Sequence, residues 1–392
     1  MRVVSSLAVV LCFLLSTVPA QPQDVLTPVI ASPLRPTAFA FQGTDHRQHL
    51  VYELTITNTG SAPATLQQIE VVDKDSPAKA LAVFEGEALL VRLWTPGRAL
   101  ATTPQIEPNG TRLFLADFTL DGNSHVPHTL LHRFHLLASG PPGSPKDEAV
   151  PYTYTIAPIA VSTDIAVISP PLAGEDWVAL NGCCEPTGAH RGTGLPVNGE
   201  IHYAQRFAID WMQLDADRRF SHGDGKDVHD YADYGAKVIA VADGTVVETL
   251  SNLDDQPVGS LPDPKTITLE NVDGNHIVLD LGHGRYAFYA HLQKNSLLVV
   301  KGQHVKRGQV LALLGNTGNS SAPHLHFHLM DGPSVLGSSG LPYVIDHFQV
   351  AGQLSREQFD KTGIDGEWNE GLDKTSSSRS QEFPLDLTVV DF

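Results

Sequence analysis

The sequence predicts an all-β protein, and two observations carry this prediction. Short segments with alternating apolar and polar residues recur along the chain, as at residues 50–58 and 65–73. Such alternation is typical of half-buried strands. Gly, Pro and Asn clusters, such as 59–63 and 108–110, separate these segments without any sustained helical period. Short strands with frequent turns favour a β-sandwich for the first half of the chain.

In chain order, the strands expected in residues 21–168 lie at 50–58, 65–73, 112–118, 128–137 and 152–161. The stretch 54–60 resembles strands of bacterial immunoglobulin-like domains. We find no residue pattern suited to catalysis in this half. We therefore expect an N-terminal immunoglobulin-like β-sandwich with an accessory role.

A second domain is expected at residues 169–350, after the Pro and Gly residues at 170–174. Asn198 and Gly199 predict a tight hairpin turn. Glycine-bounded strands are expected around it, at 200–210, 234–247, 274–281, 285–292 and 305–318. After residue 350 the chain becomes polar, so we expect a partly flexible C-terminal extension at 351–392 that ends in a strand at 385–390.

Length and charge limit the classes of partner. The chain has 392 residues, enough for two domains, and its 44 acidic residues outnumber 26 Lys and Arg, giving a net charge of −18. No basic run interrupts this acidity. Nucleic acid and anionic membrane surfaces are therefore not expected partners.

The first 20 residues have the features of a signal peptide. Arg2 precedes an apolar run at 3–15, and small residues end at Ala20, where we expect cleavage. The run is too short for a comfortable membrane span, and no later segment could form one. We expect export to a periplasm or the extracellular space. Cys183 and Cys184 would remain, either as a vicinal disulfide, as free thiols or paired between chains.

Three histidines predict a metal site in the second domain. His324, His326 and His328 alternate, so in a strand they face one side, and imidazole is a common metal ligand. Asp210 lies among apolar residues, where a carboxylate needs a metal or a charged partner. Arg206 is the local candidate for such a partner.

Several motifs occur in an order that resembles one enzyme family. They are Asp210, the 238–246 run with its Asp-Gly pair, Tyr-Ala-His-Leu at 289–292, the 302–309 and 315–320 segments, and His-Leu-His-Phe at 324–327. This order resembles the lysostaphin-type (LytM-like) zinc metallopeptidases over about residues 190–330. The resemblance implies a mostly antiparallel β domain with a groove, and hydrolysis of peptide bonds in peptidoglycan cross-links.

The resemblance also implies residue roles. Asp210 and His326 match two zinc ligands, whereas His324 and His291 match the pair beside the reacting water and the substrate. We expect His324 to act as general base and His291 to stabilise the transition state, although the two roles could be exchanged. Tyr289, two residues before His291, should face the same side and contact substrate, but a place in the core fits it equally.

The chain departs from the family pattern at two positions. The usual first zinc histidine is replaced by Arg206, which cannot bind zinc and would instead support Asp210 or bind a substrate carboxylate. His328 stands where the family usually has Glu. The first departure leaves open an alternative function, in which a degenerate peptidase-like domain binds cell-wall peptides or regulates another hydrolase.

Two upstream histidines could supply the third ligand. His202 lies about 26 Å from Asp210 along an extended strand, and would need a sharp bend. If Asn198 and Gly199 form a two-residue turn, continued pairing sets His190 opposite Phe207, and one bulge would turn its ring to the metal. We therefore favour His190 over His202.

Overall fold

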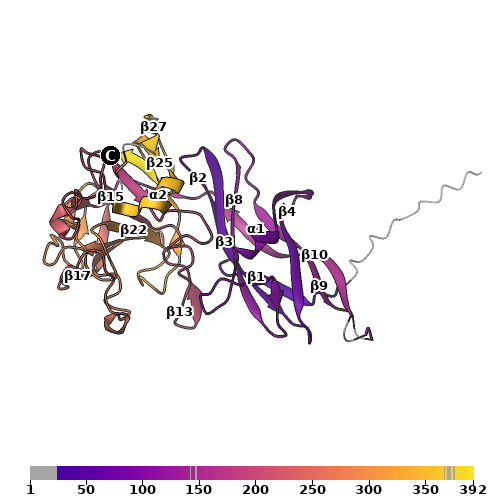
Figure 1. Ribbon diagram of the computed structural model, residues 1–392. Coiled ribbons are helices and arrows are strands. Elements are labelled where there is room, and N and C mark those ends of the chain that lie inside the picture. Colours follow the sequence, from indigo (N-terminus) through magenta and orange to yellow (C-terminus); the bar gives the residue numbers. More distant parts are fainter. Residues whose placement is uncertain (1–23, 142, 146–147, 366, 369–371, 374–375) are drawn as a thin grey trace, which may run out of the picture.

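The computed structural model describes residues 24–392 except 142, 146–147, 366, 369–371 and 374–375. The predicted signal peptide lies outside the described residues. Strands make up most of the regular structure, so the predicted all-β class is confirmed. Figure 1 shows two lobes side by side, one formed by the indigo and magenta strands and the other by the orange and yellow ones. Within the described residues, no helix has the length and apolarity needed to cross a membrane.

The described part of the N-terminal half forms one curled sheet. Its order is β5-β4-β9-β10-β2-β3-β8-β6, with β1 on β3 and β7 on β4. The bounds are β1 (Val29–Pro33), β2 (Thr37–Gln42), β3 (Arg47–Asn58), β4 (Ala64–Asp73), β5 (Ser76–Glu85), α1 (Gly86–Leu90), β6 (Leu93–Trp94), β7 (Gln105–Ile106), β8 (Thr111–Asp121), β9 (Thr129–Ser139) and β10 (Ala149–Ser162).

Two antiparallel halves of this sheet face one core. A short parallel pairing between β10 and β2 joins the halves. Leu54 of β3 and Phe114 of β8 meet Ile69 of β4 and Phe134 of β9 in the same buried cluster. The alternating residues of the two halves therefore fill one shared core. We call these two facing halves the N-terminal sandwich. The predicted immunoglobulin-like fold stays a prediction.

The second half is built on a twelve-stranded sheet among the described residues, ordered β20-β17-β18-β19-β22-β15-β12-β28-β25-β26 with β23 on β22 and β27 on β25. The bounds in this half are β11 (Ala166–Ile168), β12 (Trp177–Leu180), β13 (Leu195–Val197), β14 (Glu200–His202), β15 (Ile209–Gln213), η1 (Val228–Asp230), β16 (Lys237–Ile239), β17 (Gly244–Leu250), η2 (Pro264–Thr266), β18 (Asn275–Asp280), β19 (Tyr286–Leu292), β20 (His304–Val305), β21 (Val310–Leu313), β22 (Leu325–Met330), β23 (Gly340–Leu341), β24 (Tyr343–Ile345), β25 (Phe348–Leu354), α2 (Arg356–Thr362), η3 (Gly363–Asp365), β26 (Leu372–Asp373), β27 (Ser377–Arg379) and β28 (Thr388–Asp391).

The C-terminal residues contribute strands to this sheet. β28 pairs with both β12 and β25, so the predicted last strand is present within the main sheet. The predicted boundary at residue 350 falls inside β25. The boundary at 168 coincides with the end of β11, which pairs in parallel with β24. The division into domains stays a prediction at these boundaries.

The two lobes share a buried interface. Phe41 and Val51 of the N-terminal sandwich pack in the core cluster of the second lobe, beside Phe207 and Phe383. The buried carboxylate of Glu53 on β3 contacts the guanidinium groups of Arg191 and Arg206. The sandwich thus contacts the chain segment that leads into the candidate site.

Candidate metal centre

Three adjacent strands at the middle of the large sheet carry the candidate site. β15 pairs with β22 so that Asp210 lies directly opposite His326. β22 also pairs with β19, where Ala290 is opposite His326. Directly opposite side chains on antiparallel strands lie on the same face, with Cβ atoms about 4.5–5.5 Å apart. The pairing register alone therefore places the carboxylate of Asp210 next to the imidazole of His326.

Asp210 is surrounded by hydrogen-bond donors. Its Oδ1 lies 2.8 Å from His326 Nδ1 and 3.5 Å from His324 Nε2. Its Oδ2 accepts a hydrogen bond of 2.8 Å from Asn181 Nδ2 and lies 3.3 Å from His190 Nε2. Burial alone would raise the pKa of Asp210, but His190, His324 and His326 hold it well below its usual range.

His190 reaches the site through a turn. The predicted hairpin register is present, since Val197 pairs with Glu200 and Leu195 with His202. The ladder ends there, so the expected extension that would set His190 opposite Phe207 is wrong. The chain instead turns at 188–193, where Thr193 N donates to His190 O. This turn brings the His190 ring to 4.9 Å from the His326 ring, centroid to centroid.

His190, Asp210 and His326 form a cluster that could hold a metal ion. Each residue offers one ligand atom, and these atoms all lie within 4.8 Å of one another. All three residues are buried. His190 Nδ1 donates to Ala208 O at 3.1 Å, which leaves Nε2 as the nitrogen facing Asp210. Burial lowers the pKa of His326, whereas the Asp210 carboxylate outweighs burial and raises that of His190. The cluster has the composition of a divalent-metal site.

His324 and His291 lie beside this cluster. His324 Nδ1 donates to Ala322 O at 2.8 Å, and His291 Nδ1 donates to Thr317 O at 2.7 Å. In each ring Nε2 is therefore the nitrogen without a backbone partner, and His324 Nε2 is the one that lies 3.5 Å from Asp210 Oδ1. The two ring centroids are 4.6 Å apart. Burial, and then the neighbouring rings of His324 and His326, hold the pKa of His291 well below its usual range.

A β-bulge sets the direction of His291. Between the pairs Asn275–Leu292 and Ile277–Tyr289, β18 has one residue and β19 has two. His291 is one of the two, and its φ of 62° lies in the left-handed region. An extra residue shifts the alternation of a strand. The His291 side chain consequently reaches the same cavity as His326, although the two strands are regular on either side.

The site opens into a cavity of about 440 Å³. His190, Asp210, His291, His324 and His326 line one part of it. Apolar side chains line another part, including Phe359 of α2 and Ile364 of η3. The C-terminal residues therefore form a wall of the candidate site, which the sequence did not indicate.

Two residues predicted to bind substrate lie elsewhere. Tyr289 is fully buried on the opposite face of β19, where its hydroxyl accepts from Val241 N at 3.0 Å. Of the two places expected for Tyr289, the core is therefore the one present, and the expected contact with substrate is wrong. The bulge after Tyr289 explains this, because it separates the faces of Tyr289 and His291. Arg206 is buried with Nη1 2.6 Å from Glu53 Oε2 and Nη2 2.9 Å from Gly340 O. It therefore contacts neither Asp210 nor the cavity.

His202 and His328, the other two histidines considered from the sequence, lie in different places. His202 Nδ1 lies 2.5 Å from Arg35 Nη2, at the interface with the sandwich, and does not line the cavity. His328 lies beneath the site, with Nδ1 3.0 Å from His326 Nε2. Of the three alternating histidines, His326 and His328 are thus in direct contact, whereas His324 precedes β22 and faces the cavity.

Sequence reasoning missed Asn181. Its side chain holds the Asp210 carboxylate from the end of β12, which pairs with β15 so that Leu180 lies opposite Asp210. No local pattern marks this asparagine. Recognition of the β12–β15 pairing would have placed residues 180–181 next to Asp210.

Comparison with known proteins identifies part of the chain. Residues 224–336 match the model of peptidase family M23. The matched range contains His291, His324 and His326, whereas His190 and Asp210 precede it.

Two curated relatives come from Vibrio cholerae serotype O1. The chain is 47% identical over 57 residues to the peptidoglycan DD-endopeptidase ShyA, covering 14% of this chain and 13% of the relative. It is 43% identical over 76 residues to the peptidoglycan DD-endopeptidase ShyB, covering 19% and 17%. The aligned parts thus span less than a fifth of either relative.

Among solved structures, the catalytic domain of lysostaphin from Staphylococcus simulans matches at 23% identity and a TM-score of 0.24, over 42% of this chain and 88% of that domain. The resemblance inferred from the motifs agrees with the family match. Residues 224–336 of this chain are a peptidase family M23 domain.

Proposed function

We propose that the protein is an exported zinc metalloendopeptidase that hydrolyses peptide bonds in peptidoglycan cross-links. The observation that carries the proposal is the cluster of His190, Asp210 and His326, beside His324 and His291 in one open cavity. The family match and the names of the two Vibrio relatives support the substrate class. Export follows from the predicted signal peptide, and the N-terminal sandwich is assigned an accessory role.

The donor set fits zinc. Two imidazoles and one carboxylate are ligands that zinc prefers, and three protein ligands leave one of four tetrahedral positions open for chemistry. Metal binding requires a deprotonated carboxylate and neutral imidazoles. The depressed pKa of Asp210 and the lowered pKa of His326 favour these forms. The pKa of His190 is raised by Asp210, so zinc would have to displace a proton from His190 on binding.

Contacts behind the ligands orient them. Metal-bound histidines usually donate their other N–H to a carbonyl or a carboxylate, which fixes the ring. Ala208 O accepts from His190 Nδ1, and His328 Nδ1 can accept from His326 Nε2. In our proposal His328 takes the orienting role at the position where the family usually has Glu. Asn181 fixes the second oxygen of Asp210.

The remaining two histidines would perform the proton chemistry. Zinc held by the three ligands would supply Lewis acidity, which activates water for attack and polarises the scissile carbonyl. His324 Nε2 would take the proton of the attacking water. His291 Nε2 would donate to the oxygen that becomes negative on the carbonyl. The carbonyls of Ala322 and Thr317 hold these two rings in position for both tasks.

The alternative function, a degenerate peptidase-like domain that binds cell-wall peptides or regulates another hydrolase, depended on Arg206 replacing the usual zinc histidine. In our proposal His190 supplies the ligand that Arg206 cannot, and Arg206 belongs to the buried ion cluster with Glu53. No observation then favours loss of zinc.

The test combines metal content with hydrolysis. Purified full-length protein is analysed for zinc and incubated with peptidoglycan, and the released fragments are identified by mass spectrometry. We expect about one zinc per chain and cleavage that a chelator abolishes and added zinc restores. His324→Ala should keep zinc and lose cleavage, since it removes the base and spares the ligands. Zinc-loaded protein that binds peptidoglycan without cleaving it would favour the binding-domain alternative.

A further inference from the structure

A disulfide between adjacent cysteines lies at the interface between the two lobes. Cys183 and Cys184 are joined to each other, and Cys183 packs in the main core cluster. Cys184 is only half-buried, and its Sγ lies 3.7 Å from Nδ1 of His49 on β3. An imidazole thus contacts one sulfur of the disulfide from the other lobe.

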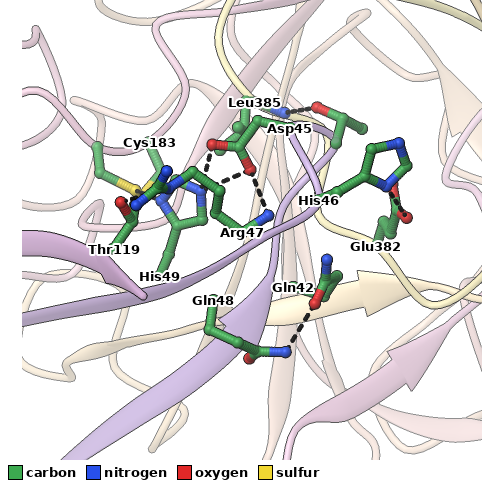
Figure 2. A network of polar contacts seen from close by, with 12 residues as sticks. Gln42, Asp45, His46, Arg47, Gln48, His49, Thr119, Cys183, Glu382 and Leu385 are labelled. Carbon is green, nitrogen blue, oxygen red and sulfur yellow. Dashed lines mark hydrogen bonds and ion pairs between the residues drawn. A yellow bond between two sulfur atoms is a disulfide. The ribbon is translucent and has the colours of Figure 1, made fainter. Parts of the chain in front are cut away.

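The same imidazole is held by a carboxylate. His49 Nε2 lies 3.0 and 3.1 Å from the two carboxylate oxygens of Asp45, and the ring of Phe41 stacks on His49. Gly43 makes room for this pair, because a Cβ at residue 43 would lie 2.8 Å from His49 Nε2 and 2.9 Å from Asp45 Oδ1. Figure 2 shows Asp45, His49 and the disulfide together, while His46 turns away towards Glu382.

The carboxylate of Asp45, the imidazole of His49 and the sulfur of Cys184 lie in an order that suits proton transfer to the sulfur. A carboxylate orients an imidazole, and a protonated imidazole stabilises an adjacent thiolate. Thiolates are both the nucleophiles and the leaving groups of thiol–disulfide exchange. His49 is therefore placed to supply a proton to Cys184 when the disulfide opens.

A second cavity of about 750 Å³ borders the disulfide. Both cysteines and His49 line it. Its other charged groups are largely paired, because Asp117 bonds Arg92, and Arg356 bonds both Asp360 and Asp386. Glu185 also lines the cavity but is exposed. His49 is thus the titratable group in direct contact with the sulfur.

We propose that Cys183, Cys184, His49 and Asp45 form a thiol–disulfide exchange site that takes a dithiol as its co-substrate. One thiolate of the dithiol attacks Cys183 Sγ, and the bond between the two cysteine sulfurs breaks. Its electron pair goes to Cys184 Sγ, which receives a proton from His49 Nδ1. The second thiol of the dithiol then attacks the dithiol sulfur that is bonded to Cys183, and the bond to Cys183 Sγ breaks. The proton of this second thiol passes to Cys183 Sγ and the dithiol leaves as a cyclic disulfide, so two electrons pass to the protein.

The test measures how fast a small dithiol reduces the folded protein. Full-length protein is incubated with dithiothreitol without denaturant, free thiols are alkylated at intervals, and peptide mapping quantifies modification at Cys183 and Cys184. We expect complete reduction in the wild type. His49→Gln should slow reduction of the disulfide by about 10-fold or more. We expect an effect near or below the low end of the usual range for a positioned proton donor, because attack by the thiolate continues without the donor.

His46→Gln is the matched control, because His46 lies in the turn that leads into β3, binds Glu382 and makes no contact with sulfur. Asp45→Asn keeps the imidazole and should give a smaller slowing. Circular dichroism checks that each variant is folded, and alkylation after denaturation gives the total thiol count. Equal rates for His49→Gln and His46→Gln would overturn the proposal. Failure of dithiothreitol to reduce the folded wild type would also overturn it.

Discussion

Replacement of Glu53 by Gln should destabilise the protein strongly. Glu53 is 1% exposed and pairs through one oxygen with Arg191 and through the other with Arg206. The substitution keeps the shape of the side chain but leaves two buried guanidinium groups without a counter-charge. Removal of one partner from a buried ion pair typically costs about 3–5 kcal/mol. We expect the free energy of unfolding to fall by about that amount.

Glu200→Gln provides a matched control. Glu200 also forms an ion pair between the lobes, 3.0 Å from Arg35, but its side chain is 65% exposed. Exposed pairs contribute about 0–1 kcal/mol. Urea unfolding followed by tryptophan fluorescence and by far-UV circular dichroism measures both variants. Coincidence of the two signals shows that a single free energy applies.

Glu53→Gln should also weaken zinc binding. Arg191 directly follows His190, and without the ion pair to Glu53 its guanidinium keeps the hydrogen bonds from Nη2 to Tyr52 O and Ala116 O. Loss of the ion pair loosens the turn that presents the proposed ligand. Zinc affinity should therefore fall in Glu53→Gln and stay at the wild-type value in Glu200→Gln. Burial of an ion pair is what should make the two variants differ. If Glu53→Gln and Glu200→Gln lose stability by amounts that agree within about 1 kcal/mol, burial does not have the effect we assign to it.

Two further predictions concern the ligand support and the sandwich core. Asn181→Leu removes the hydrogen bond to Asp210 Oδ2 and should weaken zinc binding by about 10–100-fold in a competitive chelator titration; unchanged affinity would contradict the supporting role. Burial lowers the pKa of His132 from its ordinary value of 6.5 to about 4. Between these values the unfolded chain binds a proton that the folded chain does not, so stability should fall by about 3 kcal/mol as the pH drops from 6.5 to 4. His132→Gln should reduce this pH dependence in urea unfolding, and an unchanged dependence would exclude His132 as its source.

The part of the site that sequence reasoning located depends on short-range rules. The two-residue turn at Asn198 and Gly199 fixed the hairpin register, which the structure reproduces from Leu195 to His202. Alternation placed His326 and His328 on one face of β22. Ordered motifs marked Asp210 and His326 as neighbours before their strand pairing was known. These features depend on residues only a few positions apart or on the order of known motifs.

The errors arise where tertiary structure overrides those rules. Alternation along β19 placed Tyr289 with His291, but the bulge opposite His276 reverses the face between them. Arg206 has its partner in Glu53, 153 residues earlier in the chain, and no local pattern indicates such a pair. His190 reaches Asp210 by a turn and not by continued pairing. Each of these features depends on contacts that form only when the two lobes and the large sheet are assembled.

We propose that His190, Asp210 and His326 together bind one zinc ion. Zinc titration of His190→Ala and His202→Ala is the sharpest test. His202 lies at the end of the hairpin and His190 in the turn that precedes it, but of the two only His190 lines the cavity. We expect His190→Ala to lose zinc affinity by more than the roughly 100-fold upper range for supporting residues, while His202→Ala keeps the wild-type value. Loss of zinc in His202→Ala with retention in His190→Ala would show that His190 is not the third ligand.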